Sequence, residues 1–435
     1  MAEKRDIVVA GGGLAGLAAG TLLPDAVVLE KEAIPGGLLA SPSHDGFTID
    51  LVPHVFFTRD QTAIRFFEES VGAGRFLLTD SDVRVWSHGV LTRFPFQSNL
   101  KGLPAEAVVD CLHGFAAARG RPPAKVENFQ DFALASFGDG VVRRFLDPYN
   151  RKLWGVDALS DLTCDWVSGK VGTLSPREVV EGAFLDRRFT RLPNAEFRYP
   201  IDGGIQSFAT GAARRVPGLR LGAEIARIDL EARRVATVAG EEYEYRKLIY
   251  TLSLTALPRL VSDLPAEVAA AVGRLRYRDV IGVHFGVGRE DVASWHWMYL
   301  PEPEFPFYRV SFPSRMSSAN APRGCSCLIA EVAVDPGEPV DFHALMARCR
   351  AGLVRCGVLR ESDPVLLAKC YRLSPAYVVY DHARAPALGV IEQYLESHDV
   401  LTAGRFGKWR FFNMDHTLLS GMEAAARATA EAAQG

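Results

Sequence analysis

The sequence predicts an α/β fold in which a nucleotide-binding core is interrupted by a helical insert and an antiparallel-sheet insert. Three patterns predict it. The chain opens with a strand, a glycine turn and a helix, as "RDIVVAGGGLAGLAAGTLL" (5–23). Residues from about 101 to 190 carry mainly helical patterns. Residues 219–251 alternate apolar and polar side chains between turns, as antiparallel strands do.

The individual elements follow from local signals. Pro24 ends the first helix, and "AVVLEK" (26–31) predicts a second, parallel strand that completes a βαβ unit. Strand patterns lie at 80–98, 278–288 and 327–335, and helical patterns lie at 342–357 and at the C-terminus. We therefore expect discontinuous domains: a Rossmann-like domain at 1–79, 196–275 and 363–435, a helical domain at 101–184, and a substrate domain of antiparallel sheet at 80–100, 185–195 and 276–362.

Composition excludes several classes of protein. The 435 residues carry 49 basic and 52 acidic side chains, a net charge of −3, which argues against a nucleic-acid partner. No apolar run reaches the length of about 18 residues that a membrane helix needs, and the N-terminus lacks signal-peptide features. We expect a cytoplasmic protein without a membrane partner. The seven cysteines show neither disulfide nor zinc spacing, so no metal is predicted.

The glycine turn predicts a dinucleotide. Gly11, Gly13 and Gly16 form G-x-G-x-x-G between a strand and a helix, and Glu30 ends the second strand 19 positions after Gly11. The glycines allow a pyrophosphate to approach the backbone, the helix N-terminus favours its charge, and the carboxylate suits ribose hydroxyls. An acid at this position fits NAD or FAD.

Later motifs favour FAD. "EAIPGGLLAS" (32–41), "GFTIDLVPHVFFT" (46–58), "YPIDGGIQSFATGAARRV" (199–216) and "AEIARIDL" (223–230) resemble segments of the FAD proteins that include amine oxidases and protoporphyrinogen oxidase. The resemblance implies an FAD-binding domain with the following contact residues: Gly11, Gly13, Leu14, Ala15, Gly16, Glu30, Lys31, Gly37, Leu38, Leu39, His54, Ile225, Arg405, Asn413, Met414, Asp415 and Thr417.

Five further motifs resemble one branch of these proteins, the UDP-galactopyranose mutases, and among them the eukaryotic-type enzymes. They are "LTRFPFQSNLKGLP" (91–104), "LDPYNRKLWGVDALSDLTCDWVSGKVG" (146–172), "LPNAEFRYPIDGG" (192–204), "WMYLPEPEFPFYRVSF" (297–312) and "GRFGKWRFFNMDH" (404–416), with "SPAYVVYDH" (374–382) as a looser match. The resemblance extends over nearly the whole chain. It implies an isomerase that contracts the ring of a nucleoside diphosphate sugar with reduced FAD, whose N5 displaces the diphosphate.

The side chains in these motifs suit such a ligand. Aromatic rings can stack on a base, amides can pair with its edge, and cations and hydroxyls can bind a diphosphate. The predicted stacking residues are Phe94, Phe96, Tyr149 and Trp154, and the amides are Gln97 and Asn150. The predicted phosphate and sugar contacts are Arg309, Lys170, Tyr299, Tyr377, Asn194, Trp297 and Phe411. The catalytic candidates are Arg309 and His54, with His54 positioning the flavin-facing turn.

Four departures from the family pattern fall at this site. Val52 replaces a glycine beside the flavin, Lys170 replaces a phosphate-binding arginine, and Phe94 and Phe411 replace tyrosines. A lysine lacks the bidentate fork of arginine, and each phenylalanine lacks a hydroxyl donor. We therefore predict a substrate other than UDP-galactopyranose, such as a GDP- or dTDP-hexose.

Three alternatives stay open. The first is an FAD-dependent oxidase of amines or polycyclic compounds, for which a pocket with Arg309 and Lys170 is unsuitable. The second is a flavin-independent, metal-assisted mutase, and the third is a sugar-nucleotide binder without catalysis. For the mutase, NAD(P)H is the candidate reductant of the flavin.

Overall fold

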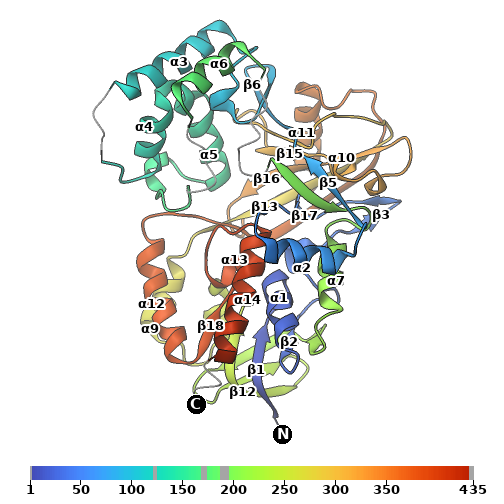
Figure 1. Cartoon of the computed structure of the whole chain (residues 1–435), viewed down its shortest axis with the longest axis vertical. Helices are drawn as coiled ribbons and strands as arrows, with labels where there is room; N and C mark the ends of the chain where they lie inside the picture. Colours follow the sequence, from blue (N-terminus) through green and yellow to red (C-terminus); the bar gives the residue numbers. More distant parts are fainter. Residues whose placement is uncertain (1, 121–124, 168–173, 187–194, 431–435) are drawn as a thin grey trace.

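The structure is a computed structural model that describes residues 2–120, 125–167, 174–186 and 195–430. Its lower half in Figure 1 contains a seven-stranded sheet, here the first sheet, with strand order β10-β11-β12-β1-β2-β9 and β18 beside β12. The strands β1, β2, β9, β12 and β18 pair in parallel, and β10 and β11 add an antiparallel edge. The strands are β1 (Glu3–Ala10), β2 (Val27–Leu29), β9 (Leu219–Arg220), β10 (Ile225–Asp229), β11 (Arg234–Thr237), β12 (Glu242–Tyr250) and β18 (Val400–Thr402).

Helices cover both faces of the first sheet because its central strand is apolar on both sides. Ile7 and Val9 of β1 face one core, and Val8 and Ala10 face the other. The first core is covered by α1 (Leu14–Leu22), α2 (Gln61–Val71), α7 (Gln206–Ala213) and α14 (Met414–Ala430). The second is covered by α8 (Leu257–Leu260), α9 (Ala266–Gly273) and α12 (Arg384–Ser397). The predicted α/β class is confirmed.

A second seven-stranded sheet lies above the first, with order β17-β13-β16-β15-β14-β6-β7. All its pairs are antiparallel except β6 with β14. The strands are β6 (Val83–Ser87), β7 (Val90–Arg93), β13 (Tyr277–Val287), β14 (Trp297–Tyr299), β15 (Arg309–Ser311), β16 (Ser326–Val334) and β17 (Val365–Val378), and α10 (Pro313–Met316) and α11 (Phe342–Arg355) accompany them. Two small pairs, β3 (Ser43–His44) with β4 (Phe47–Thr48) and β5 (Phe76–Asp80) with β8 (Glu196–Pro200), complete the strands.

One predicted boundary is wrong. Residues 363–378 were assigned to the nucleotide-binding domain, but β17 pairs with β13 and so belongs to the second sheet. A strand pattern does not reveal its partner, and here the partner lies about 90 residues earlier in the chain. The rest of the domain division stays a prediction.

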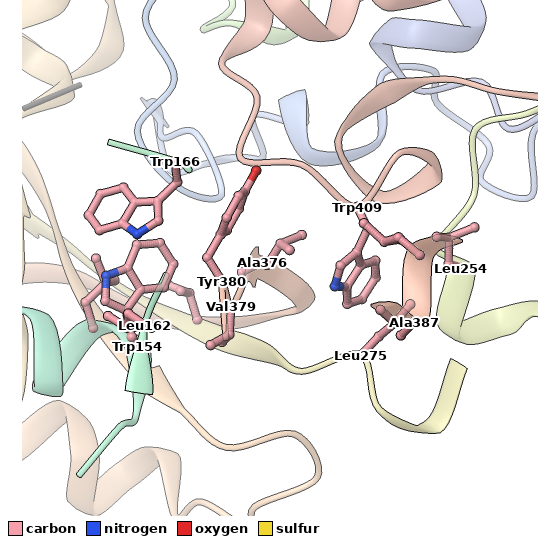
Figure 2. Close-up of a cluster of buried hydrophobic side chains, with 14 of the residues drawn as sticks. Trp154, Leu162, Trp166, Leu254, Leu275, Ala376, Val379, Tyr380, Ala387 and Trp409 are labelled. Atoms are coloured by element: carbon pink, nitrogen blue, oxygen red, sulfur yellow. The ribbon is translucent and has the colours of Figure 1, made fainter. Parts of the chain in front are cut away.

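The helical segment stands apart at the top of Figure 1 and contains α3 (Ala105–Arg119), α4 (Phe129–Val141), α5 (Asp147–Trp154) and α6 (Pro176–Phe184). Its buried side chains join the second core, the one that α8, α9 and α12 also cover. Figure 2 shows Trp154 and Trp166 near Tyr380, with Trp409 and Ala387 farther along the same cluster. A single apolar core therefore links the helical segment to the first sheet.

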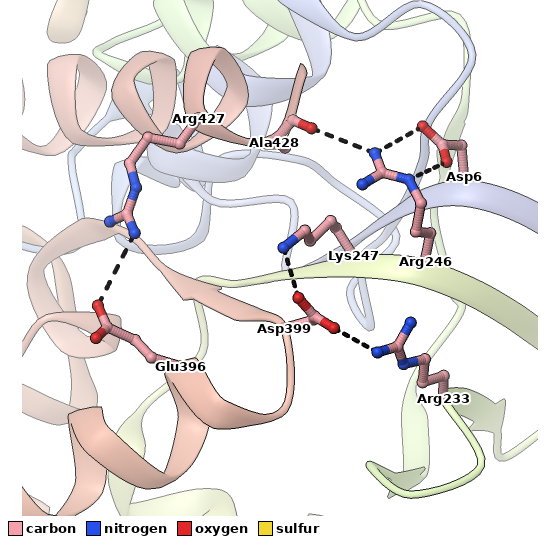
Figure 3. A network of polar contacts seen from close by, with 8 residues as sticks. All are labelled: Asp6, Arg233, Arg246, Lys247, Glu396, Asp399, Arg427 and Ala428. Carbon is pink, nitrogen blue, oxygen red and sulfur yellow. Dashed lines mark hydrogen bonds and ion pairs between the residues drawn. The ribbon is translucent and has the colours of Figure 1, made fainter. Parts of the chain in front are cut away.

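Polar contacts tie the central strands of the first sheet to each other, to α14 and to the turn before β18 (Figure 3). Arg246 of β12 donates to Asp6 of β1 through Nε at 2.6 Å and to the Ala428 carbonyl of α14 at 3.3 Å. Lys247 donates to Asp399 at 2.6 Å, in the turn between α12 and β18. Among the described helices, none combines the length and apolar character needed to cross a membrane.

Candidate active site

A cavity of about 910 Å³ lies between the two sheets and the helical segment. Its walls come from the turn at 52–55, helix α5, strands β14, β15 and β17, and the segment 405–416. The predicted site residues on its lining are Leu38, His54, Phe94, Gln97, Tyr149, Asn150, Trp154, Trp297, Tyr299, Arg309, Tyr377, Arg405, Phe411, Asn413, Met414 and Asp415. The fold therefore gathers side chains from widely separated motifs around one space.

The remaining predicted site residues lie elsewhere. The residues of the dinucleotide motif and its surroundings lie off the cavity lining: Gly11, Gly13, Leu14, Ala15, Gly16, Glu30, Lys31, Gly37, Leu39, Ile225 and Thr417. Phe96 is also off the lining. Lys170 and Asn194 fall outside the described residues, so their predicted roles stay predictions.

The glycine turn has the geometry that a pyrophosphate needs. Gly11 has φ +104°, and its N–H donates to the Leu29 carbonyl at 2.9 Å. A Cβ on Gly16 would lie 1.8 Å from the Gly11 oxygen, so α1 packs directly on the turn. A Cβ on Gly13 would meet nothing within 4 Å. The space in front of the α1 N-terminus is therefore open, and an anionic phosphate group fits there.

Two backbone hydrogen bonds fix the Glu30 carboxylate beside this turn. Its Oε2 accepts the Gly12 N–H at 2.8 Å and its Oε1 accepts the Glu32 N–H at 2.9 Å. A carboxylate has about four acceptor positions, so two are left for ribose hydroxyls. Lys31, in contrast, is exposed and pairs with Glu32 at 3.3 Å. The turn and the acid together fit the adenosine diphosphate part of FAD.

The turn that carries Val52 and His54 is fixed from several sides. The buried Asp50 accepts hydrogen bonds from the Ser41 hydroxyl at 2.6 Å, the Tyr199 hydroxyl at 2.9 Å and the Ile205 N–H at 3.0 Å. His54 Nδ1 donates to the Val52 carbonyl at 3.0 Å. These bonds hold the turn in place, and the role of His54 in positioning it against a flavin stays a prediction.

Strand β13 supports the same turn from behind. His284 is 1 % exposed, and its Nε2 donates to the Leu51 carbonyl at 3.0 Å. Burial lowers the pKa of His284 to about 4. Burial, with the nearby charge of Arg405, lowers the pKa of His54 to about 3. Both imidazoles are therefore neutral at pH 7, and each must keep one N–H donor for its carbonyl.

These pKa shifts predict a loss of stability in acid. A histidine whose folded pKa lies below its unfolded value of about 6.5 stabilises the fold above that pH, and the stabilisation is lost as the pH falls. Asp50 acts in the opposite direction, because burial raises its pKa to about 6 and its contribution is lost as the pH rises from about 4 to 6. We expect the urea midpoint to fall from pH 6.5 toward pH 4.

His284→Gln should reduce this pH dependence, because the amide keeps the donor for Leu51 and does not titrate. The measurement is the urea midpoint of wild type and variant across the same pH range. Equal slopes in both proteins would remove His284 as a source of the effect.

Arg309 lines the cavity but is not free. Its guanidinium forms a bidentate pair with Glu331, through Nε with Oε2 and through Nη2 with Oε1 at 2.7 Å. Glu331 is fully buried and also accepts the Tyr308 hydroxyl at 3.0 Å. The pair is cross-strand, since Arg309 of β15 lies opposite Glu331 of β16. The sequence analysis missed this partner, which fixes the orientation of the cation.

Arg405 plays a larger structural part than predicted. Its Nε and Nη2 donate to the Phe412 carbonyl at 2.9 and 2.7 Å, and its Nη1 donates to the Ala376 carbonyl at 3.1 Å. Every nitrogen of the guanidinium is thus engaged with backbone, which braces the segment 405–412 against β17. A contact of Arg405 with flavin or diphosphate stays a prediction. Such a contact would use the N–H groups of the guanidinium that do not bond to these carbonyls.

One predicted base contact is corrected, and a second has internal partners. Phe96 is fully buried and stacks on Phe145 at 5.0 Å, so its ring belongs to the core rather than to a ligand surface. Asn150 donates to the Leu146 carbonyl at 2.7 Å and accepts the Trp154 indole N–H at 3.0 Å. One N–H and one lone pair of that amide are therefore used within the helical segment, and a contact of the remaining N–H and lone pair with a base stays a prediction. Side-chain direction in a short turn or helix end depends on tertiary packing, which a motif does not show.

Gln97 and the aromatic rings retain the predicted character. No hydrogen bond of the Gln97 amide occurs within the described residues, and the side chain lines the cavity while only 6 % of the residue is exposed. Phe411 meets Trp154 edge-on at 5.6 Å and Tyr377 at 5.8 Å. Phe94 meets Tyr299 at 5.2 Å. This end of the cavity therefore offers flat apolar surfaces together with the Gln97 amide.

Several other residues line the cavity but are not among the predicted contacts. Trp166, Phe129 and Phe145 extend the aromatic end, and Asp82, Arg93 and Glu196 place charges at another part of the lining. Trp166 stood within a quoted motif, so its aromatic character was the available signal. Within the described part of the chain, no three His, Cys, Asp or Glu side chains come together as a metal site.

Comparisons with known proteins agree with this geometry. Residues 14–341 match the family model of flavin containing amine oxidoreductases. A crystal structure of reduced UDP-galactopyranose mutase superposes with a TM-score of 0.92 at 27% identity, covering 99% of this chain and 94% of that one. A putrescine oxidase bound to putrescine (TM-score 0.65, 15% identity, 99% and 100% covered) and a CLA-producing fatty acid isomerase from P. acnes (0.64, 12%, 97% and 98%) share the fold.

The family match, the superposition and the open glycine turn lead to one assignment. The cofactor is FAD, because the family is flavin containing, the chain superposes on a reduced UDP-galactopyranose mutase, and Gly13 and Glu30 leave room and acceptors for it. The chain is an enzyme of the mutase-like or oxidase-like kind. It belongs to the flavin containing amine oxidoreductase family and is a UDP-galactopyranose mutase-like member of that FAD-dependent superfamily.

Proposed function

We propose that the protein is a nucleoside diphosphate hexose pyranose–furanose mutase that works with reduced FAD. One observation carries the proposal: a single cavity extends from the turn at Val52 and His54 to an aromatic end with Gln97, and Arg309 lies on its wall. These three kinds of surface suit a flavin, a sugar diphosphate and a base. The likeness to reduced UDP-galactopyranose mutase over 99% of the chain supports the same reading.

The protein's side chains would bind and orient the substrate. Reduced flavin supplies a nucleophile for the anomeric carbon when it is bound. Arg309, held by Glu331, would place a fixed positive charge beside the diphosphate as it leaves and returns. Burial raises the pKa of Tyr299, so its hydroxyl stays protonated, and it already accepts the Trp297 indole N–H at 3.2 Å. Its proton is left for a substrate oxygen.

We propose further that the preferred hexose nucleotide is not UDP-galactopyranose. Phe94 and Phe411 present rings to the cavity where the resembled family has hydroxyls, and Val52 adds bulk at the flavin-facing turn. Loss of hydroxyl contacts should weaken the binding of UDP-galactopyranose. A site shaped for a different hexose nucleotide should also discriminate against UDP-galactopyranose. The predicted contacts of Lys170 and Asn194 belong to this proposal.

A substrate screen tests the proposal. UDP-, dTDP- and GDP-hexoses are offered to dithionite-reduced protein, and furanose products are scored by chromatography, with a thermal-shift assay for binding. We expect a dTDP- or GDP-hexose to turn over faster than UDP-galactopyranose. Turnover of UDP-galactopyranose at least as fast as every other hexose would show that the departures are tolerated variation.

One alternative function has a specific observation in its favour. The family and the putrescine oxidase likeness both allow an FAD-dependent oxidase of amines or polycyclic compounds. The cavity gives the polycyclic form little support, because the Arg309–Glu331 ion pair lies on its lining and an apolar ligand offers that pair no polar partner. A metal-assisted mutase has no support within the described residues. We propose NAD(P)H as the reductant of the flavin and the cytoplasm as the location.

A further inference from the structure

Lys152 lies just behind the cavity wall and is almost fully engaged. It stands in α5 between Asn150 and Trp154, both of which line the cavity, but it is not on the lining itself. Its Nζ donates to the carbonyls of Leu300 at 2.9 Å, Glu302 at 2.6 Å and Phe307 at 3.3 Å. An ammonium group has three N–H donors, so each has a partner here.

All three acceptors belong to the loop that joins β14 to β15. That loop begins directly after Tyr299 and ends at Tyr308, next to Arg309, and its ends are joined by the Leu300 N–H to the Tyr308 carbonyl at 3.0 Å. The second sheet therefore presents Tyr299 and Arg309 to the cavity from the two strand ends that flank this loop, and the loop backbone is tied to the helical segment. Lys152 is a direct polar bridge between these two walls.

We propose that Lys152 is a positioning residue that fixes the separation of two opposing cavity walls: the α5 wall with Tyr149 and Trp154, and the β14–β15 wall with Tyr299 and Arg309. The inference rests on the proposed function, since these walls are the proposed nucleotide and diphosphate surfaces. The aromatic contact across them, Tyr149 with Tyr299 at 5.5 Å, depends on the same separation. Loss of the bridge lets the walls move apart and weakens ligand binding without touching the glycine turn.

The charge of Lys152 gives the bridge a pH dependence. Burial lowers the pKa of Lys152 to about 8, opposed by Glu302 and Glu304 of the loop. Around them, Glu302 Oε1 accepts the His88 N–H at 2.8 Å, and His88 Nε2 contacts Arg144 at 2.9 Å. A neutral amine has only two N–H donors for three carbonyls. The bridge is therefore complete below about pH 8 and loses one bond and its charge above it.

The test uses the flavin-loaded full chain with Lys152→Met, Lys152→Arg and a control, Lys101→Met, at an exposed lysine. UDP, dTDP and GDP are titrated from about pH 6.5 to about pH 9.5, with tryptophan fluorescence as the signal, since Trp154, Trp166 and Trp297 line the cavity. We expect wild-type affinity to fall as the pH rises through about 8. Lys152→Met should bind about tenfold or more weakly at pH 7, without that pH step and with unchanged flavin content.

Two further results complete the test. Lys152→Arg should restore part of the affinity and remove the step, because a guanidinium stays charged over this range. Hydrogen exchange of residues 297–311 should be faster in Lys152→Met than in wild type and Lys101→Met. Wild-type affinity in Lys152→Met, or unchanged exchange of 297–311, would overturn the proposal. If wild type binds none of the three nucleotides, the proposed function fails and the exchange result alone decides the role of Lys152.

Discussion

Gly13→Asp should give a folded protein that has lost its flavin. A Cβ at Gly13 would meet no protein atom within 4 Å, so we expect the fold to accommodate a side chain there. The same side chain would occupy the open space before the α1 N-terminus, and its carboxylate would repel a pyrophosphate. The measurement is the visible flavin absorption of the purified protein, with circular dichroism and thermal unfolding of the flavin-free form as tests of folding.

A matched control separates this effect from a general cost of the substitution. Gly389 lies exposed in α12, where an added Cβ also meets nothing within 4 Å, so Gly389→Asp should keep its flavin. Gly16→Ala should instead fail to fold, because its Cβ would lie 1.8 Å from the Gly11 oxygen. Full flavin content in Gly13→Asp would show that the cofactor does not lie at this turn.

Arg309→Ala should have two effects of different origin. Removing charge-assisted hydrogen bonds to a diphosphate costs roughly 1.5–3 kcal/mol, so nucleoside diphosphate affinity should fall more than tenfold. The variant also leaves Glu331 buried without its cation, and breaking such a pair costs roughly 3–5 kcal/mol of stability. Flavin content should be unchanged in folded protein. Calorimetric titration and urea unfolding measure the two effects separately.

A double variant distinguishes binding from structure. In Arg309→Met with Glu331→Met, apolar side chains replace the whole pair, and such replacements of buried ion pairs are often neutral or stabilising. We expect stability to return toward that of the wild type while nucleotide affinity stays low. Recovery of both would mean that Arg309 supports the fold only and does not contact a ligand.

The sequence was most informative where structure is local. The strand, glycine turn and helix around Gly11 and Gly16 form a continuous unit, so pattern alone located them and Glu30. The C-terminal motif was also placed correctly at the cavity, although only Arg405 of its cations lines it and Trp409 is buried in the core. A motif therefore indicated the segment but not the direction of each side chain.

Pairing between distant strands could not be predicted from the sequence. Glu331 is the one charged residue inside an apolar strand, but its contact with Arg309 depends on the register of β15 with β16. The same limit explains the misplaced β17, whose partner β13 is remote in the chain. Phe96 and Gln97 are adjacent in one turn, yet the first packs in the core and the second lines the cavity. Tertiary packing selects between such neighbours.

The most direct test of the proposed mutase is the dependence of product on the state of the flavin. The protein is incubated with its preferred nucleoside diphosphate hexose, and separately with an amine, in oxidised, dithionite-reduced and flavin-free form, and furanose and hydrogen peroxide are both measured. The account predicts furanose from the reduced form alone, with no net oxidation of the sugar. Peroxide from an amine substrate without any furanose, or furanose formed equally well by the flavin-free protein, would contradict it.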